Sequence, residues 1–243
     1  MDSSADGRVV WITGAGSGIG RATAIEAATA GWRVALTGRR APALDETVAA
    51  VQEAGGAALV LPGDATSDDV IRASLDRITA TWGRLDALVL AAGLNAPERR
   101  WADHDPATFD EIVRVNLTGP AHLVTAALPL LRASHGVVVF VSSYAAWAFN
   151  PIAGVAYSAS KAGLSALSRT LNAQEAASGV RSCHLCPGDV NTDFLGHRPQ
   201  VPSDDARAAM LQPSDVARSV RFVLEAPTHV RFDELVVSPV SQT

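Results

Sequence analysis

The chain has 243 residues, of which 48% are hydrophobic, and a formal net charge of −5. This length is sufficient for one large α/β domain with a substantial core. The acidic balance, without a long block of one charge, argues against a nucleic-acid-binding surface. No apolar run approaches the roughly 20 residues that cross a membrane. Residues 1–7 are acidic rather than apolar, so we predict no signal peptide and expect a cytoplasmic protein.

Apolar runs alternate with helical patterns along the chain. Strands are predicted at residues 9–12, 34–37, 57–61, 87–90, 137–141, 180–185 and 235–237, and helices at about 18–30, 42–54, 67–81, 108–133, 158–177 and 213–225. This alternation is typical of a doubly wound parallel sheet. We therefore predict a single Rossmann-type α/β domain over residues 1–243, with about seven strands and helices on both faces. The stretch from about 190 to 210 has no clear period.

A glycine-rich turn follows the first predicted strand. Gly14, Gly18 and Gly20 stand between an apolar run and a helical pattern. Glycine lets the backbone approach a pyrophosphate closely, and a helix N-terminus offers free N–H groups and the positive end of the helix dipole. Strand, glycine turn and helix in this order predict a dinucleotide-binding site. An ordinary turn is the alternative.

Lys161 is the single lysine among 20 basic residues, and it follows Tyr157 by four positions. Residues i and i+4 of a helix share a face, so the ammonium is expected beside the phenol. A nearby positive charge lowers the pKa of a tyrosine, which makes the phenol usable as an acid or base near neutral pH. The alternative is that a bias toward arginine left one lysine by chance.

Together these motifs resemble the short-chain dehydrogenase/reductase family. Gly14, Gly18 and Gly20 match its GxxxGxG motif, Tyr157 and Lys161 match its YxxxK motif, and further similarity runs from about residue 9 to residue 237. The resemblance implies hydride transfer between a nicotinamide cofactor and the carbonyl or secondary alcohol of a small-molecule substrate.

The resemblance also implies four catalytic residues. Tyr157 would exchange a proton with the substrate oxygen, and Lys161 would lower the Tyr157 pKa and hold the nicotinamide ribose. Ser143 would polarise the substrate oxygen, and Asn116 would hold a water that links Lys161 to solvent. Taken singly, Ser143 is also compatible with a strand-end serine, and Asn116 with a helix residue bonded to backbone.

Further matches imply the residues that bind the cofactor. Asp64 would meet the adenine, and residues 187–192 would receive the nicotinamide carboxamide. The complete predicted cofactor set is Gly14, Ser17, Gly18, Ile19, Gly20, Arg39, Arg40, Asp64, Ala65, Ala92, Gly93, Tyr157, Lys161, Pro187, Gly188, Val190 and Thr192.

The residues after the second strand predict the choice of cofactor. A site for NAD usually carries Asp or Glu about 20 residues past the glycines, where it bonds the ribose hydroxyls. Here Gly38 is followed by Arg39 and Arg40. A guanidinium binds a 2′-phosphate through charge-assisted hydrogen bonds, which a carboxylate cannot do. We predict NADP(H) rather than NAD, with Arg39 as the phosphate ligand. The alternative is two solvated arginines that open the next helix.

Two positions depart from the family pattern. Ala91 stands where the family usually has an asparagine, and Asn95 lies too far along the chain to replace it. Ser143 and Tyr157 are fourteen positions apart, one more than is usual in the family, which predicts a one-residue bulge between them. The aromatic residues of this insert either border an apolar substrate pocket or only pack the loop: Tyr144, Trp147 and Phe149.

Cys183 and Cys186 form a CxxC pair, which suggests a metal or redox site. The segment predicts a strand, in which these two positions point to opposite faces, and no second cysteine pair completes a zinc site. We therefore predict two buried cysteines that pack as small apolar residues, and no metal site. The six histidines are scattered, and we expect ordinary structural or surface roles for them.

The sequence leaves the substrate open. In the family, the segment at about 190–210 forms a mobile lid over the substrate. Residues 234–242 resemble the branch that contains NADP-dependent 3-hydroxy acid and serine dehydrogenases, so a 3-hydroxy acid dehydrogenase is an alternative. Arg99 and Arg100 are candidates to meet a substrate carboxylate, although we expect both to be solvated.

A catalytically silent dinucleotide-binding regulator is the rival function, because a fold alone never proves activity. Such a protein does not need Asn116, Ser143, Tyr157 and Lys161 together. By resemblance to the family we expect a homodimer or homotetramer, with no nucleic-acid or membrane partner.

Overall fold

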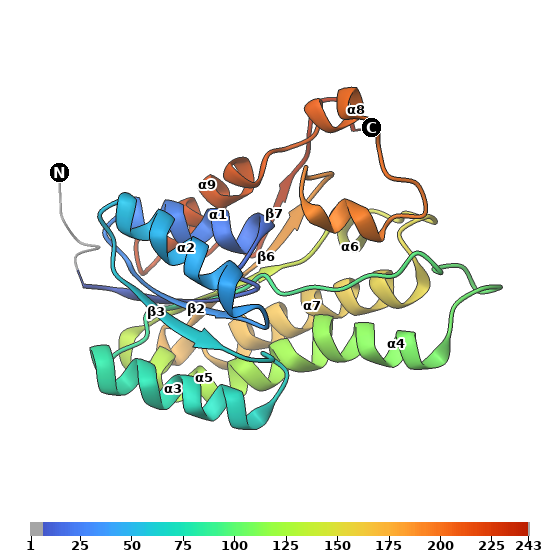
Figure 1. Ribbon diagram of the computed structural model, residues 1–243. Helices are drawn as coiled ribbons and strands as arrows, with labels where there is room; N and C mark the ends of the chain where they lie inside the picture. Colours follow the sequence, from blue (N-terminus) through green and yellow to red (C-terminus); the bar gives the residue numbers. More distant parts are fainter. Residues whose placement is uncertain (1–6, 243) are drawn as a thin grey trace.

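The computed structural model describes residues 7–242, and a seven-stranded parallel sheet runs through its centre (Figure 1). The sheet order is β3-β2-β1-β4-β5-β6-β7. The strands are β1 (Val9–Thr13), β2 (Arg33–Gly38), β3 (Ala58–Pro62), β4 (Ala87–Leu90), β5 (Val137–Val141), β6 (Arg181–Pro187) and β7 (Glu234–Val237). The predicted Rossmann-type α/β fold is confirmed.

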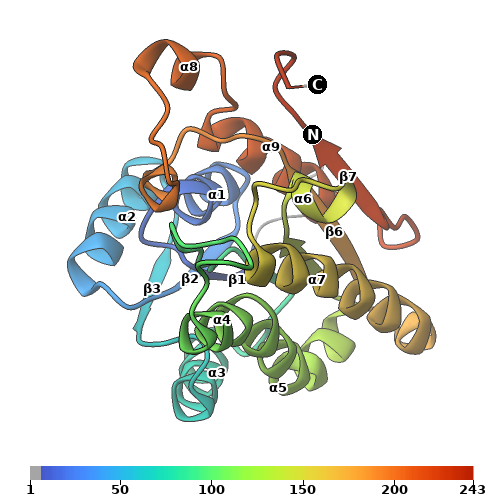
Figure 2. The same cartoon turned by 90° about the vertical axis from the view of Figure 1, so that its right-hand side faces the viewer.

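Helices cover both faces of the sheet (Figures 1 and 2). One layer consists of α1 (Gly18–Thr29), α2 (Ala41–Glu53) and α9 (Pro213–Leu224). The other consists of α3 (Asp68–Trp82), α4 (Pro106–Val113), α5 (Gly119–Ser134) and α7 (Val155–Gln174). Because each strand is followed by a crossover that returns to the same edge, all neighbouring strands pair in parallel.

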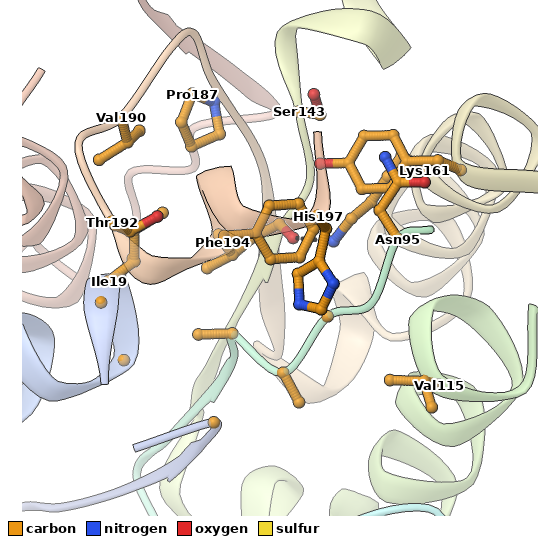
Figure 3. A pocket seen from close by; sticks show the side chains of 18 of the residues that line it. Ile19, Asn95, Val115, Ser143, Lys161, Pro187, Val190, Thr192, Phe194 and His197 are labelled. Carbon is orange, nitrogen blue, oxygen red and sulfur yellow. Dashed lines mark hydrogen bonds between the residues drawn. The ribbon is translucent and has the colours of Figure 1, made fainter. Parts of the chain in front are cut away.

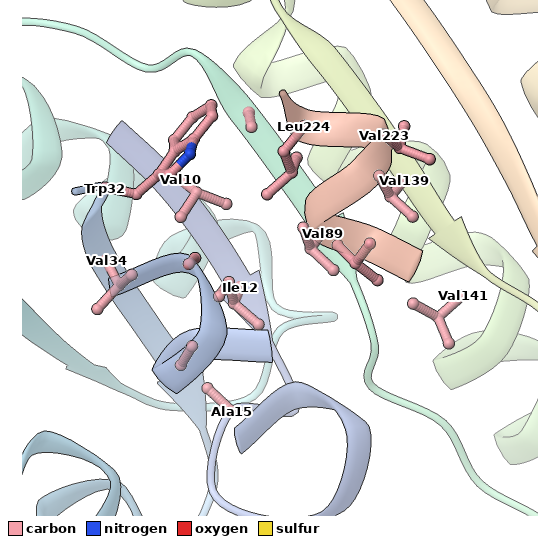
Figure 4. Packing of buried hydrophobic residues seen from close by; sticks show 14 of the residues in the cluster. Val10, Ile12, Ala15, Trp32, Val34, Val89, Val139, Val141, Val223 and Leu224 are labelled. Atoms are coloured by element: carbon pink, nitrogen blue, oxygen red, sulfur yellow. The ribbon is translucent and has the colours of Figure 1, made fainter. Parts of the chain in front are cut away.

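The central strand β1 divides the core into two clusters. All five of its residues are buried. Val10 and Ile12 pack with the α1 and α9 side of the sheet (Figure 4), whereas Val9 and Trp11 pack with the opposite side. A parallel strand with helices on both faces is apolar throughout, which explains why the sequence shows continuous apolar runs rather than alternation.

The strand order reverses direction at β1. The chain runs outward from β1 to β2 and β3, then returns to β4 on the other side of β1 and continues to β7. The connections that leave β1 and β4 therefore diverge, and this opens a crevice at the carboxyl edge of the sheet where ligands of such folds bind.

The predicted helix at 108–133 is interrupted. A π-helical turn, Arg114–Thr118, separates α4 from α5. Pro120 has no backbone N–H, so it cannot donate the α-helical hydrogen bond to the Asn116 carbonyl four residues earlier. The resulting widened turn places the buried Asn116 side chain against the loop after β4.

Several short elements were not predicted from the sequence. They are α6 (Tyr144–Trp147), 3₁₀ turns at Ala176–Ser178 and Asp193–His197, and α8 (Asp204–Ala208). Elements of one turn are too short to show a hydrophobic period. Across residues 7–242, no helix is both long enough and apolar enough to cross a membrane.

Asp86 should be a stability determinant at the amino edge of the sheet. Its buried carboxylate accepts a hydrogen bond of 2.8 Å from the Val9 N–H and pairs with Arg84. We expect Asp86→Ala to lower the free energy of unfolding in urea by about 1–3 kcal/mol, because the Val9 N–H loses its partner. Asp76→Ala, an exposed position on α3, is the control and should change it little. Equal effects of the two substitutions would contradict this assignment.

Candidate active site

A cavity of about 1090 Å³ opens at the carboxyl edge of the sheet. It is lined by residues that follow each of the seven strands, together with residues of α7 (Figure 3). All seventeen residues of the predicted cofactor set line it. Of the four predicted catalytic residues, Ser143, Tyr157 and Lys161 line it, and Asn116 does not.

The glycine turn has the geometry of a phosphate cradle. Gly14 and Gly18 have φ angles of 65° and 52°, which side chains disfavour. A Cβ on Gly20 would lie 2.3 Å from the Gly14 carbonyl oxygen, so only glycine fits. Ser17 begins α1 without a capping side-chain hydrogen bond, which leaves N–H groups of the first turn free for an anionic ligand. These features fit the pyrophosphate of a dinucleotide.

Arg39 and Arg40 line the same cavity beyond the end of β2 and are exposed. Within residues 7–242, neither guanidinium forms an ion pair. Asp64, the predicted adenine contact, lies nearby at the end of β3. Its carboxylate accepts hydrogen bonds from the Thr66 N–H and from Arg114. Although burial raises its pKa, the Thr66 hydrogen bonds and the Arg114 charge hold the pKa below the usual value.

Lys161 is buried beside Tyr157 on α7, as their spacing predicts. The Lys161 Nζ lies 5.9 Å from the centroid of the Tyr157 ring and donates a hydrogen bond of 2.8 Å to the Val141 carbonyl. Only 4% of Lys161 is exposed. This burial lowers the Lys161 pKa to about 8, against a smaller opposing effect of Cys186, because a desolvated ammonium is disfavoured.

The Tyr157 phenol is under opposing influences. Burial is the largest and raises its pKa, while a hydrogen bond with the Ser143 side chain and the charges of Arg99 and Arg198 lower it; the net change is upward. Lys161, which was expected to lower the Tyr157 pKa, is therefore not among the main influences on that pKa. The main cationic contributions come from Arg99, in the loop after β4, and from Arg198, in the segment after β6.

Asn116 acts as a brace behind the cavity wall. Its amide Oδ1 accepts a hydrogen bond of 2.7 Å from the Leu94 N–H, and its Nδ2 donates to the Leu94 carbonyl and to Ser160 Oγ. The side chain is fully buried. It ties the loop after β4 to α7, and its amide is engaged with protein atoms rather than facing the cavity.

The insert between Ser143 and Tyr157 folds as α6 followed by a turn. Ser143 caps α6 by accepting a hydrogen bond from the Ala145 N–H. Tyr144 lines the cavity and packs edge-on against Trp147 at 5.2 Å. Trp147 and Phe149 are exposed and do not line the cavity. The aromatic residues of the insert thus divide between the pocket and the surface.

Ala91, which stands where the family usually has an asparagine, is accommodated by apolar packing. Ala91 contacts the apolar cluster around β1. Asn95 does not replace the missing asparagine at the sheet centre, in agreement with the sequence analysis, because it donates a hydrogen bond to the Ala153 carbonyl and so holds the loop before α7.

One prediction about this loop is wrong. Both arginines line the cavity, and Arg100 is exposed as expected, but Arg99 is only partly exposed. Its charge influences Tyr157. The pair of adjacent arginines in the sequence gave no signal as to which of them is more buried, because that depends on the fold of the loop.

Residues 190–200 close one side of the cavity. Val190 pairs with Leu211, and the segment continues into the 3₁₀ turn Asp193–His197. The Phe194 ring lies 6.0 Å from the Tyr157 ring and 5.3 Å from the His197 ring. The sequence analysis did not identify Phe194, His197 or Arg198 as site residues, since the segment has no periodic pattern.

The two cysteines are buried on opposite faces of β6. Cys183 packs in the α1–α9 cluster, whereas Cys186 contacts His184. The ligand atoms of His184, Cys186 and Glu234 lie within 4.8 Å of one another, a grouping that the sequence analysis missed. Burial is the main cause that raises the Cys186 pKa to about 12, so without a bound metal the thiol is protonated at neutral pH.

Comparison with known proteins agrees with this geometry. The chain matches the family model described as short chain dehydrogenase over residues 8–201. It is 34% identical to a cis-4-hydroxycyclohexanecarboxylate dehydrogenase of Sinomonas cyclohexanicum over 226 residues, which cover 89% of this chain and 88% of the relative.

Solved structures of dehydrogenases also resemble this chain over nearly its whole length. An alcohol dehydrogenase from the archaeon Thermococcus sibiricus, complexed with 5-hydroxy-NADP, superposes with a TM-score of 0.87 at 29% identity, covering 97% of this chain and 98% of that chain. A short chain dehydrogenase from Mycobacterium paratuberculosis, bound to NAD, superposes with a TM-score of 0.84 at 27% identity, covering 97% of both chains.

The buried Lys161 predicts an unusual pH dependence of stability. Its pKa is about 8 in the folded protein and has an ordinary value of 10.5. Between these pH values the unfolded chain retains a proton that the folded chain has lost, so the contribution of Lys161 to the free energy of unfolding rises with pH, by about 3 kcal/mol in total.

Lys161→Met should remove this contribution. The variant is expected to be more stable than the parent protein at pH 7, and the difference should shrink as the pH approaches 10.5. Urea denaturation at a series of pH values measures it, and a difference that does not change with pH would contradict the assigned pKa.

Proposed function

Because the chain belongs to the short chain dehydrogenase family, we propose that it is an NADP(H)-dependent oxidoreductase that interconverts a carbonyl compound and a secondary alcohol. The observation that carries the proposal is the shared cavity, in which Ser143, Tyr157 and Lys161 face the same space as the uncapped start of α1. The bound cofactor would supply or accept the hydride.

Each of the three side chains has a defined part in this proposal. Tyr157 donates a proton to the carbonyl oxygen in reduction and accepts one in oxidation. Its raised pKa keeps the phenol protonated at neutral pH, the state that reduction requires. Ser143 hydrogen-bonds the substrate oxygen, and Lys161 holds the nicotinamide ribose. Asn116 fixes the wall behind them through Leu94.

The electrostatics at the end of β2 favour NADP(H). Arg39 is exposed, lines the cavity and has no ion-pair partner among residues 7–242, so its guanidinium is available to a 2′-phosphate. Asp64 is already engaged by Thr66 and Arg114. Structural relatives are complexed with 5-hydroxy-NADP in one case and NAD in another, so the preference rests on Arg39.

The segment that includes Phe194 borders the place where the substrate would bind. We propose that residues 190–210 act as a lid over the substrate, since Phe194 packs beside Tyr157. The substrate panel for activity tests should include hydroxy acids, because one relative is named for a hydroxycyclohexanecarboxylate.

Tyr157→Phe tests the proton transfer. Removal of the hydroxyl should reduce kcat by at least about 100-fold, while the affinity for NADPH stays within about twofold, because the ring remains. Nicotinamide absorbance with a panel of ketones, aldehydes and oxo acids measures turnover, and fluorescence titration measures NADPH binding. Retained turnover in the variant would overturn the role of Tyr157.

Arg39→Asp tests the cofactor preference. A carboxylate at this position should lower kcat/KM for NADPH by about tenfold or more, because it repels the 2′-phosphate and loses the charge-assisted hydrogen bonds. The kcat/KM for NADH should stay the same or rise. Arg40→Asp is the matched comparison and should have a smaller effect. An unchanged NADPH/NADH ratio in Arg39→Asp would show that Arg39 is not the phosphate ligand.

A further inference from the structure

The backbone of Arg99, in the loop after β4, is held at a fixed position on the cavity wall. Its carbonyl accepts a hydrogen bond of 3.0 Å from the Val155 N–H. Gly154 packs so closely that an added Cβ would lie 2.8 Å from the Arg99 Cβ, and its φ angle of 110° also requires glycine. The Arg99 side chain therefore starts from backbone that is held on both sides.

The Arg99 guanidinium is partly buried and has no counterion. Its Nε donates a hydrogen bond of 2.8 Å to the Ala96 carbonyl, Nη2 donates to the His197 carbonyl, and Nη1 makes a long hydrogen bond of 3.5 Å to the Ile152 carbonyl. All three acceptors are neutral, and within residues 7–242 no carboxylate pairs with Arg99. A guanidinium has five N–H donors, so donors remain free. A desolvated cation without an anion is energetically unfavourable, and an anionic ligand would relieve this.

A second guanidinium lines the same cavity from the segment after β6. Arg198 lines the cavity and pairs with Asp189 at 2.5 Å. Arg99 Nη2 donates to the carbonyl of His197, the residue before Arg198, so the two arginines belong to segments in contact. The Arg99 pKa is lowered first by burial and then by the charge of Arg198. Both charges also act on Tyr157. Because Arg198 is already paired with Asp189, Arg99 is the guanidinium of this pair that lacks a carboxylate partner within residues 7–242, and it acts on the phenol that would meet the substrate oxygen.

Resting on the function proposed above, we propose that the substrate carries a carboxylate and that Arg99, assisted by Arg198, binds this carboxylate beside Tyr157. The substrate class is thus hydroxy acids and their oxo-acid counterparts. In reduction, the carbonyl carbon gains a hydride from the reduced nicotinamide, which is oxidised, and the carbonyl oxygen gains the proton of Tyr157. The carboxylate takes no part in bond changes and serves only for recognition, through charge-assisted hydrogen bonds.

A purely structural role for Arg99 makes a different prediction. Its hydrogen bonds to Ala96 and His197 join the loop after β4 to the segment after β6, so its loss could loosen the cavity as a whole. Loosening would weaken the binding of charged and neutral ligands alike. If Arg99 binds a carboxylate, its loss should weaken the binding of carboxylates alone. Comparing a carboxylate with its primary amide therefore distinguishes the structural role from the binding role.

The test is calorimetric titration of the NADP-loaded protein with pairs of carboxylates and their primary amides, from propionate and propionamide to cyclohexanecarboxylate and cyclohexanecarboxamide. We expect the parent protein to prefer the carboxylate in at least one pair. Arg99→Met should weaken carboxylate binding by about 10- to 100-fold, the usual effect of a hydrogen bond to a charged group, and leave amide binding unchanged. Arg99→Lys should recover part of the loss.

Arg169→Met, an exposed position on α7, is the charge-matched control and should keep the preference. Arg198→Met should reduce the preference as well and serves as the second variant if Arg99→Met does not fold. The proposal is overturned if no carboxylate binds, if amides bind equally well, or if Arg99→Met weakens both ligands equally. A carboxylate preference without turnover on any oxo acid would instead reject the proposed oxidoreductase function and leave the anion site in place.

Discussion

Parallel pairing of β1 with β4 is the constraint on which the site depends. The pairing brings the glycine turn after β1 beside the loop after β4, where a Cβ on Gly14 would lie only 2.8 Å from the Ala92 nitrogen. The same sheet carries Ser143 at the end of β5 and the loop after β6 to one edge. Residues far apart in the chain thereby share one cavity, and the apolar residues on both faces of β1 keep this edge fixed.

Burial sets the electrostatics of that cavity. It lowers the pKa of Lys161 and raises the pKa of Tyr157, so both residues are shifted toward their neutral forms. A phenol that remains protonated suits proton donation, and the neighbouring arginines offset part of the effect of burial. The cost of holding Lys161 in this environment is a reduction in stability at neutral pH, which is a common feature of sites arranged for chemistry.

Local sequence patterns were sufficient to predict the conformation of short segments whose geometry is set by neighbouring residues in the chain. The glycine spacing at 14–20 predicted a tight glycine turn before a helix, and the four-residue interval between Tyr157 and Lys161 predicted a shared helix face; the structure has both. They did not predict the hydrogen bonds between the Asn116 amide and Leu94, nor that Arg99 is more buried than Arg100. Both depend on where a distant loop lies, which no local pattern encodes.

By itself the sequence determined the order of strands and helices, the glycine turn and the identity of the groups available for chemistry, because these follow from periodicity and side-chain type over a few residues. Only the tertiary structure decided which charges act on Tyr157. Arg99 and Arg198 are separated by about a hundred positions, and they become neighbours because the loops after β4 and β6 meet at the edge of the sheet. Desolvation and Coulomb interaction depend on that arrangement in space rather than on neighbours in the chain.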